Sequence, residues 1–437
     1  MELQSGSQCK KRMDPGRMED IISELPQNIV ECILLGLPIK EAVRTSILSQ
    51  KWRYNWTTLP EIVFDEQSMV LANGKPPNNN FVNIYHVLIH HKGTIQKFSV
   101  RFPHFKRINS SNLDLWVLLL KEKGIQEIIL EFIKGDVCAV PSRLFLCEHL
   151  TYLKLSGCML KLPCPFNGLR SLRRLDLESF EVTNADFHRL LSGCSVLETL
   201  ILDDFYIDYL KFDIPSLRFL YVDGVFDHIC FDNATHMSML HVRLIVKNDN
   251  VHLNQDNGCN LIMILGCLTS IEKLYLHSHF MKFLSVSHIP TRFPIMFDCL
   301  KEICLTVNFE DLDEVSGVLC LLRSSPIFGR LQISAWLKKL GRRRSADDFW
   351  KAQNQIGCPM DQLQYVMVDQ FFGADSELQF IKYVLGKSPT LEKFIIYPRK
   401  KVRSKEPKVL EELMQYPRAS VKAEVVICSR DIGVITN

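Results

Sequence analysis

Apolar residues recur along most of the chain in a six-residue pattern, with apolar side chains at its first, fourth and sixth positions. Ten segments carry the pattern: IQKFSV from Ile95, IQEIIL from Ile125, LTYLKL from Leu150, LRRLDL from Leu172, LETLIL from Leu197, LRFLYV from Leu217, IEKLYL from Ile271, LKEICL from Leu300, LQYVMV from Leu363 and LEKFII from Leu391. The fourth and sixth positions lie two residues apart, so in a β-strand both face one side and the residue between them faces the other. The pattern therefore predicts strands with one face toward a core.

The spacing of these segments predicts a solenoid of leucine-rich repeats. The first six segments begin 20 to 30 residues apart, which matches the period of that repeat. One strand cannot bury its apolar edge alone, whereas stacked coils pair their strands in a parallel sheet above a shared core. Segments such as LSGC from Leu191 and LGK from Leu385 read as helix ends closed by glycine. We expect an α/β fold with the parallel sheet on one face and helices on the other.

A different pattern covers the first sixty residues. Apolar residues at every fourth position of Ile29–Leu37 would share one face of a helix, which Pro26 can start and Pro38 stops. A second apolar series over Val43–Trp56 predicts a second helix that runs into a third. A unit of about 45 residues buries only about 60% of its chain surface. Part of this apolar series must therefore meet another surface.

This N-terminal unit resembles the F-box of plant F-box proteins with leucine-rich repeats. The resemblance rests on Leu25-Pro26, Leu37-Pro38, Ala42-Val43, Arg44-Thr45-Ser46, Leu48-Ser49, Lys51-Trp52-Arg53 and Trp56. It implies a three-helix domain that docks on a Skp-type adaptor, which connects it to a cullin and a RING subunit. The residues that would contact the adaptor are Leu25, Pro26, Ile29, Ile33, Leu37, Pro38, Val43, Leu48 and Trp52. The alternative for any one of them is a place in the domain's own core.

The last hundred residues predict a helix followed by strands. Ser376 and Gln379 form a capping-box pattern, an apolar stripe covers Phe380–Leu385, and Gly386 with Pro389 ends the helix. The segment ADSELQFIKYVLGKSPTLEKFII, followed by YPRAS and the strand-like AEVVI, resembles the FBD module at the C-terminus of many plant F-box/leucine-rich-repeat proteins. The resemblance therefore covers nearly the whole chain.

These segments predict a domain order, with a polar linker, ANGKPPNNN, between the F-box and the repeats. The order is a disordered tail at 1–18, the F-box at 19–62, leucine-rich repeats at 80–355 and the FBD module at 356–430, which continues the repeat stack. The stretch 247–259 and the segment WLKKLGRRRSADDFW from Trp336 fit the repeat poorly. We interpret both as insertions or irregular coils.

Composition and charge narrow the range of partners. With 47% hydrophobic residues and a net charge of +3 over 437 residues, the chain is predicted to be globular and to bind neither nucleic acid nor a membrane. The 15 cysteines include no CxxC pair, and the first residues lack the apolar core of a signal peptide. We therefore expect mostly reduced thiols and a location in the nucleus, the cytoplasm or both.

The sequence carries no motif of an enzyme. It has no GxSxG, no glycine-rich phosphate loop after a strand and no HExxH. His86 with His90, and His277 with His279, have spacings that suit two metal ligands, but no third ligand lies nearby, which favours surface histidines. We expect neither a metal nor a cofactor. Because the paired Cys/His spacing of a RING domain is also missing, the chain would have to recruit a catalytic partner.

These features predict the substrate-recognition subunit of an SCF-type (Skp–cullin–F-box) E3 ubiquitin ligase, which is itself non-catalytic and holds an unknown protein substrate near a ubiquitin-charged enzyme. The residues that would face the substrate are Lys154, Asp176, Ile201, Asp203, Tyr221, Asp223 and Tyr275. Lys154, Asp176, Ile201, Tyr221 and Tyr275 would form a ladder of outward residues, and just beyond the strands Asp203 and Asp223 could stack with Glu178 and Asp204 at one rim. The rim and the ladder would favour a substrate with a basic patch beside an apolar anchor. The alternative is ordinary solvated charge beside a turn.

Two other functions stay open. The chain could be a repeat scaffold whose N-terminal helices bind some other apolar partner without ubiquitin transfer. The repeats could also need a small molecule to hold the substrate, as in hormone-receptor relatives of this architecture. The basic runs Arg342–Arg344 and Arg399–Lys401 suit nuclear import, although a solvated loop is the simpler interpretation.

Overall fold

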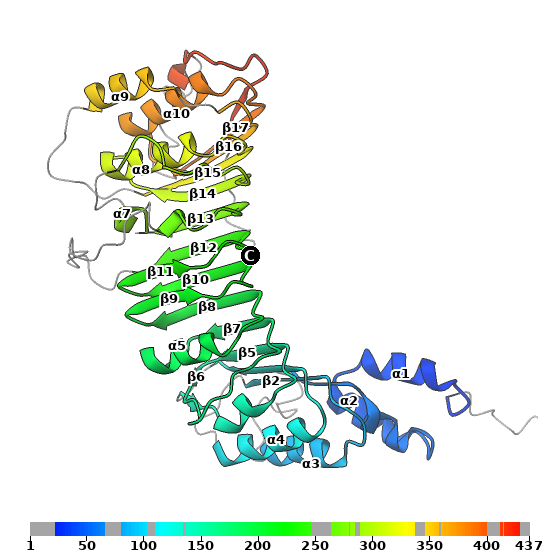
Figure 1. Ribbon diagram of the computed structural model, residues 1–437. Helices are drawn as coiled ribbons and strands as arrows, with labels where there is room; N and C mark the ends of the chain where they lie inside the picture. The colour runs from blue at the N-terminus through cyan, green and yellow to red at the C-terminus, as the bar shows by residue number, and fades with distance from the viewer. Residues whose placement is uncertain are drawn as a thin grey trace, which may run out of the picture.

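The computed structural model shows a long stack of strands with a small helical unit near one end (Figure 1). It describes residues 22–65, 80–102, 110–133, 137–245, 264–278, 280–284, 289–336, 346–357, 360–399, 411–413 and 415–428. The predicted tail at 1–18, all of the linker except Asn80, and the stretch 247–259 lie outside these residues. Within the described ranges, no helix has the length and apolarity needed to cross a membrane.

Short helices form the N-terminal unit. They are α1 (Gln27–Leu35), α2 (Ile39–Arg44) and the 3₁₀ helices η1 (Thr45–Ile47) and η2 (Trp52–Thr58). Pro26 and Pro38 each stand just before the first residue of an α-helix. That position suits proline because it has no N–H to donate and its φ is fixed near the helical value. The predicted third helix is therefore present as 3₁₀ turns.

Fourteen strands of the described residues form one parallel sheet. In sheet order they are β1 (Glu61–Phe64), β2 (Lys97–Phe102), β3 (Glu127–Phe132), β5 (Tyr152–Ser156), β7 (Arg174–Glu178), β8 (Thr199–Tyr206), β10 (Phe219–Val225), β12 (Met239–Leu244), β13 (Lys273–Ser278), β14 (Glu302–Val307), β15 (Arg330–Ala335), β16 (Tyr365–Phe371), β17 (Lys393–Pro398) and β18 (Glu424–Ile427). Strand order follows chain order, as expected when each coil of a solenoid adds one strand.

All ten predicted strand segments are strands of this sheet, and the fourth and sixth residues of each pattern are buried. The sequence analysis missed β1, β12 and β15. The patterns of the last two begin with Met237 and Phe328 in place of leucine or isoleucine, and that of β1 begins with Leu59 at the edge of the predicted F-box. All three first residues are buried. The first position therefore needs a bulky apolar side chain of any shape.

One face of the sheet is covered by helices and short strands (Figure 1). The helices are α3 (Asn80–His90), α4 (Ser110–Glu122), η3 (Ser142–Leu146), α5 (Asn184–Ser192), α7 (Phe280–Leu284), α8 (Leu312–Arg323), α9 (Ala346–Gln355) and α10 (Asp375–Lys387). Short parallel strands lie in the same layer: β4 (Cys138–Ala139) pairs with β6 (Cys158–Met159), and β9 (Tyr209–Asp213) pairs with β11 (His228–Asp232). In the coils of β6, β9 and β11 they take the place of a helix. We call the opposite face, on which the described chain places no helix, the open sheet face.

The interpretation of WLKKLGRRRSADDFW as an insertion or irregular coil is wrong for its last five residues. They form the first half of α9, and Trp350 in that helix is buried against Phe380 and Tyr383 of α10. The residues from 337 to 345 lie outside the described residues. Because Trp350 packs into the shared core, α9 is the helix of an ordinary coil.

The predicted helix near the C-terminus is α10, but its start differs from the prediction. Glu377, not the pair Ser376 and Gln379, closes the first turn. Its carboxylate accepts the backbone N–H groups of Ala374 at 2.9 Å and of Phe372 at 3.0 Å. These groups have no partner within the helix, so the glutamate satisfies donors that would otherwise be buried without one.

Candidate docking surfaces

The N-terminal unit exposes an unusual amount of apolar surface. Of the twenty large hydrophobic side chains described as exposed, eight lie within residues 22–54: Ile22, Ile29, Ile33, Leu35, Leu37, Ile47, Leu48 and Tyr54. Ile47 is 87% exposed. Such a concentration in so short a segment marks an interaction surface. We call these eight residues the apolar F-box face.

Helix α1 explains how this face arises, because it is apolar on two sides. Val30 and Leu34 are buried in the unit's own core, while Ile29 and Ile33, one position earlier in each turn, are exposed. A helix that needed only one apolar stripe would carry polar residues at the second pair of positions. The second stripe is therefore free for another partner.

The structure places the predicted adaptor-contact residues in three groups. Ile29, Ile33, Leu37, Leu48, Pro26 and Pro38 are exposed, and Leu25 and Val43 are half-buried against the core. Trp52 differs from the prediction, because it is only 3% exposed and its indole N–H donates to the carbonyl of Ile22 at 3.0 Å. The ring of Trp52 therefore belongs to the core beneath the apolar F-box face and is not part of that face.

Four members of the face escaped the sequence analysis. They are Ile22, Leu35, Ile47 and Tyr54. For Ile47 the signal was present, because it belongs to the apolar series that predicted the second helix. Helical spacing alone does not tell which residues of an apolar series face the core and which face a partner. For this reason the sequence did not show that Trp52 is buried and Ile47 is exposed.

On the open sheet face, the central outward residues of the strands form one continuous row. Strand pairing aligns Lys154 with Asp176, Asp176 with Ile201 and Ile201 with Tyr221. The row continues through His241 to Tyr275. The predicted ladder is therefore present, with His241 added because β12 was missed.

Several charged residues of this face are already paired within the chain. The carboxylate of Asp176 is buried and accepts hydrogen bonds from the Arg174 guanidinium and, at 3.0 Å, from the Tyr152 hydroxyl. Asp223 is also buried, and its Oδ2 accepts from Arg243 at 3.1 Å. Asp176 and Asp223, both predicted to contact the substrate, therefore form ion pairs within the sheet. Ile201, Asp203, Tyr221 and Tyr275 are half-buried and reach the surface.

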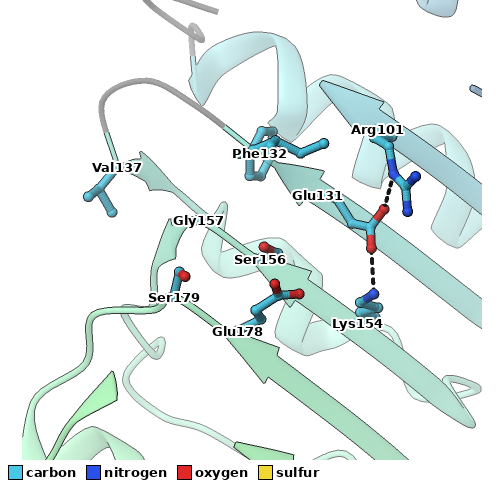
Figure 2. A pocket seen from close by; sticks show the side chains of 10 residues that line it. Arg101, Glu131, Phe132, Val137, Lys154, Ser156, Gly157, Glu178 and Ser179 are labelled. Carbon is cyan, nitrogen blue, oxygen red and sulfur yellow. Dashed lines mark hydrogen bonds and ion pairs between the residues drawn. The ribbon is translucent and has the colours of Figure 1, made fainter. Parts of the chain in front are cut away.

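Next to this row, a cavity of about 560 Å³ opens at the carboxyl ends of β2 to β7 (Figure 2). Within it, Glu131 bridges Arg101 and Lys154, and its oxygen lies 2.6 Å from the Arg101 nitrogen. Lys154 is therefore occupied by an internal ion pair. Glu178 lines the same cavity, and within the described residues the two cations there, Lys154 and Arg101, form their ion pairs with Glu131 and not with Glu178.

Three carboxylates meet at the rim beyond the row. Strand pairing places Glu178 beside Asp203, and Asp203 beside Asp223. Burial raises the pKa of the Asp203 carboxyl, and the charges of the neighbouring carboxylates raise it further. The rim is therefore a place of unbalanced negative charge.

The histidines singled out from the sequence have ordinary surroundings where the structure describes them. His86 and His90 are exposed on α3, and His277 is half-buried on β13. His279 lies outside the described residues. In the described part of the chain, no group of three or more His, Cys, Asp or Glu residues is placed to hold a metal ion.

Comparisons with known proteins divide the chain into three parts. The F-box domain model matches residues 22–63, the model for the leucine-rich repeats of the FBD-associated F-box protein At5g56370 matches 113–333, and the FBD model matches 353–396. The Arabidopsis thaliana F-box/FBD/LRR-repeat protein At1g13570 is 35% identical over 94% of this chain and 99% of its own length. The putative F-box protein At3g58860 from the same plant is 24% identical over 91% of this chain and 92% of its own length.

Proteins that combine an F-box with leucine-rich repeats are generally substrate adaptors of SCF-type ubiquitin ligases, and such subunits are typically non-catalytic. An F-box implies binding to a Skp-type adaptor within these complexes. The matches to all three models follow one another along the chain, and the similarity to At1g13570 extends over nearly its whole length. The chain therefore belongs to the plant family of F-box/FBD/leucine-rich-repeat proteins.

Proposed function

We propose that this protein is the substrate-recognition subunit of an SCF-type E3 ubiquitin ligase. The apolar F-box face binds the Skp-type adaptor, which brings the cullin and RING subunits, and the open sheet face binds a protein substrate. The observation that supports this most strongly is the apolar F-box face, whose side chains are exposed among the described residues. Binding both partners at once would hold a substrate lysine near the charged conjugating enzyme. A nuclear or cytoplasmic location fits this assignment, since buried thiols such as Cys194 and Cys320 stay reduced there.

The adaptor contact can be tested with exposed residues that have no role in the core. We expect Ile33→Asp combined with Leu48→Asp to weaken capture of a purified Skp-type adaptor by the full-length chain at least tenfold, because each charge must lose water on docking. Binding is measured by surface plasmon resonance. The matched control is Leu115→Asp, an equally exposed leucine on α4, which should leave capture unchanged.

The outcomes separate this function from a plain scaffold. If the unmodified chain binds no Skp-type adaptor offered to it, the ligase assignment fails and a repeat scaffold with another apolar partner takes its place. If the unmodified chain binds and the double variant binds equally well, the adaptor uses a different surface.

A further inference from the structure

Two neighbouring carboxylates of the open sheet face, Glu178 and Asp203, differ from Asp176, Asp223 and Glu131 on the same face. Asp176 is paired with Arg174, Asp223 with Arg243, and Glu131 with two cations. Within the described residues, no lysine or arginine forms an ion pair with Glu178 or Asp203, which are neighbours in the sheet. An unpaired carboxylate pair on a half-buried surface favours a cation from a partner.

Asp223, the register neighbour of Asp203, is a third carboxylate at this rim. It is 5% exposed, and its Oδ2 accepts from Arg243 and from the Tyr221 hydroxyl. The other oxygen, Oδ1, is buried and has no hydrogen-bond partner among the described groups. Buried polar atoms are nearly always hydrogen-bonded in native proteins. Because Oδ1 is buried, a substrate donor does not reach it, and Asp223 contributes to the rim through its charge beside Asp203.

A row of rings lies beside these carboxylates. The ring centroids of Tyr221 and His241 are 4.4 Å apart, and those of His241 and Tyr275 are 5.7 Å apart. Burial lowers the pKa of His241 to about 3, helped by the neighbouring His277 and Arg243. The imidazole is therefore neutral at working pH and brings no positive charge to the rim. The rings are tilted against one another, by 54° between Tyr221 and His241 and by 26° between His241 and Tyr275. A cation can stack on a tyrosine ring of such a row.

The same sheet shows which cation fits. The guanidinium of Arg174 lies over the Tyr152 ring, 5.1 Å from its centroid, and donates to both oxygens of Asp176 at 2.9 to 3.0 Å. In the sheet register, Arg174 is the partner of Tyr152, and Asp176 lies two residues further along the strand. Tyrosine, arginine and aspartate thus form one compact clamp.

Two strands further on, the same spacing recurs without the arginine. The register partner of Tyr221 on β8 is Ile201, and Asp203 lies two residues after it. The strand that carries the aspartate is here the preceding neighbour instead of the following one. Ile201 stands where Arg174 stands in the complete clamp, so the described residues place no guanidinium on the β8 side of Tyr221, whose hydroxyl bonds Asp223 and not Asp203.

We propose that this part of the open sheet face binds an arginine of the substrate, with its guanidinium over Tyr221 and hydrogen-bonded to Asp203 and Glu178. The aliphatic stem of the arginine packs on Ile201. Arginine fits better than lysine because its planar fork can stack on a ring and bond two carboxylates together. This inference rests on the proposed function and names the class of substrate: proteins that present arginine in an exposed basic segment.

The test uses the full-length chain bound to its adaptor and two labelled peptides of equal charge, one alternating arginine with glycine and the other lysine with glycine. Binding is measured by fluorescence anisotropy. We expect the arginine peptide to bind at least about threefold more tightly than the lysine peptide. Glu178→Gln with Asp203→Asn should weaken the arginine peptide at least tenfold, and Tyr221→Leu should remove the preference for arginine over lysine.

The matched control is Asp347→Asn with Asp348→Asn on α9, which removes the same charge from the helical layer. It should leave peptide binding unchanged. If this control weakens binding as much as Glu178→Gln with Asp203→Asn, only overall charge matters and the proposed site is wrong. Unchanged binding in the latter variant overturns it as well. Adaptor capture is measured in parallel, and the peptide titration is repeated on the full-length chain without adaptor. If the unmodified chain captures no adaptor, the ligase function fails, whereas the titration without adaptor reports on the arginine site alone.

Discussion

At the scale of single residues, the buried carboxyl of Glu314 makes the stability of the protein depend on pH. The side chain is fully buried in α8 and its Oε2 accepts the N–H of Asn308 at 2.8 Å. Burial raises its pKa to about 8. The folded state therefore holds the proton more tightly than the unfolded chain does. The stabilising contribution of the protonated form is complete below pH about 4.5 and is lost as the pH rises toward 8.

We expect Glu314→Gln to flatten this dependence, because glutamine keeps the accepting oxygen and stays neutral. Between pH 5 and 8 the unmodified protein should lose at least about 1 kcal/mol of stability relative to the variant. The measurement is the free energy of unfolding in urea at each pH. Glu377 shifts in the same direction but is present in both proteins, so its effect cancels. Parallel pH curves for the two proteins would show that Glu314 carries no such cost.

The sequence predicted which residues stand in the outward row but not which of them are free. Asp203 and Asp223 are register neighbours and carry the same side chain, and of the two only Asp203 forms no ion pair with a described cation. The difference comes from the residues around them. Arg243, which pairs with Asp223, lies on β12, the strand whose pattern begins with methionine and was missed. Because the sequence pattern did not identify β12, it could not show that Arg243 pairs with Asp223.

At the scale of elements, the turn after β5 depends on Gly157. Its φ is +68°, and a Cβ built on it would lie 2.1 Å from the carbonyl oxygen of Phe132 in the preceding coil. Gly124, after α4, has a similar φ of +74° but open space around it. A side chain at position 124 would therefore meet backbone strain alone, whereas one at position 157 would meet both strain and a steric clash.

We expect Gly124→Ala to lower the free energy of unfolding by about 1–2 kcal/mol, because alanine is strained in the left-handed conformation. Gly157→Ala should cost clearly more, because the backbone of Phe132 must also move. Free energies of unfolding in urea, measured for the full-length chain, compare the two variants. Equal losses would mean that the turn relaxes without disturbing the neighbouring coil.

Most elements could be predicted from the sequence because the period of two along a strand is a strong signal. The misses have physical causes. Met237 and Phe328 fill the first position of their coils as well as leucine does, so a pattern restricted to leucine and isoleucine passes over them. In α10 the capping carboxylate comes from Glu377, since the helix starts two residues earlier than the Ser376 pattern implied. The inward turn of Trp52 depends on 3₁₀ geometry, which helical spacing does not reveal.

At the scale of the whole molecule, the stack should open from its ends. Strand β10 is paired on both sides, by β8 and β12, whereas within the described residues β18 pairs only with β17. In a solenoid each coil is stabilised by its neighbours, so a terminal coil has about half of that support. We expect amide hydrogens of Glu424–Ile427 to exchange at least about tenfold faster than those of Phe219–Val225, as measured by mass spectrometry. Equal protection of the two strands would mean that the C-terminal coil is supported by something else.

The short strands that replace helices in the middle coils affect the curvature of the solenoid. Packed helices need about 8–10 Å from axis to axis, whereas neighbouring strands need only about 4.8 Å, and this mismatch bends a repeat protein toward its sheet. Where β9 and β11 form the second layer, both layers advance by the same step. The stretch around β8 and β10 therefore runs straight, and an extended peptide can lie flat across it where a rounded domain would touch at only one point.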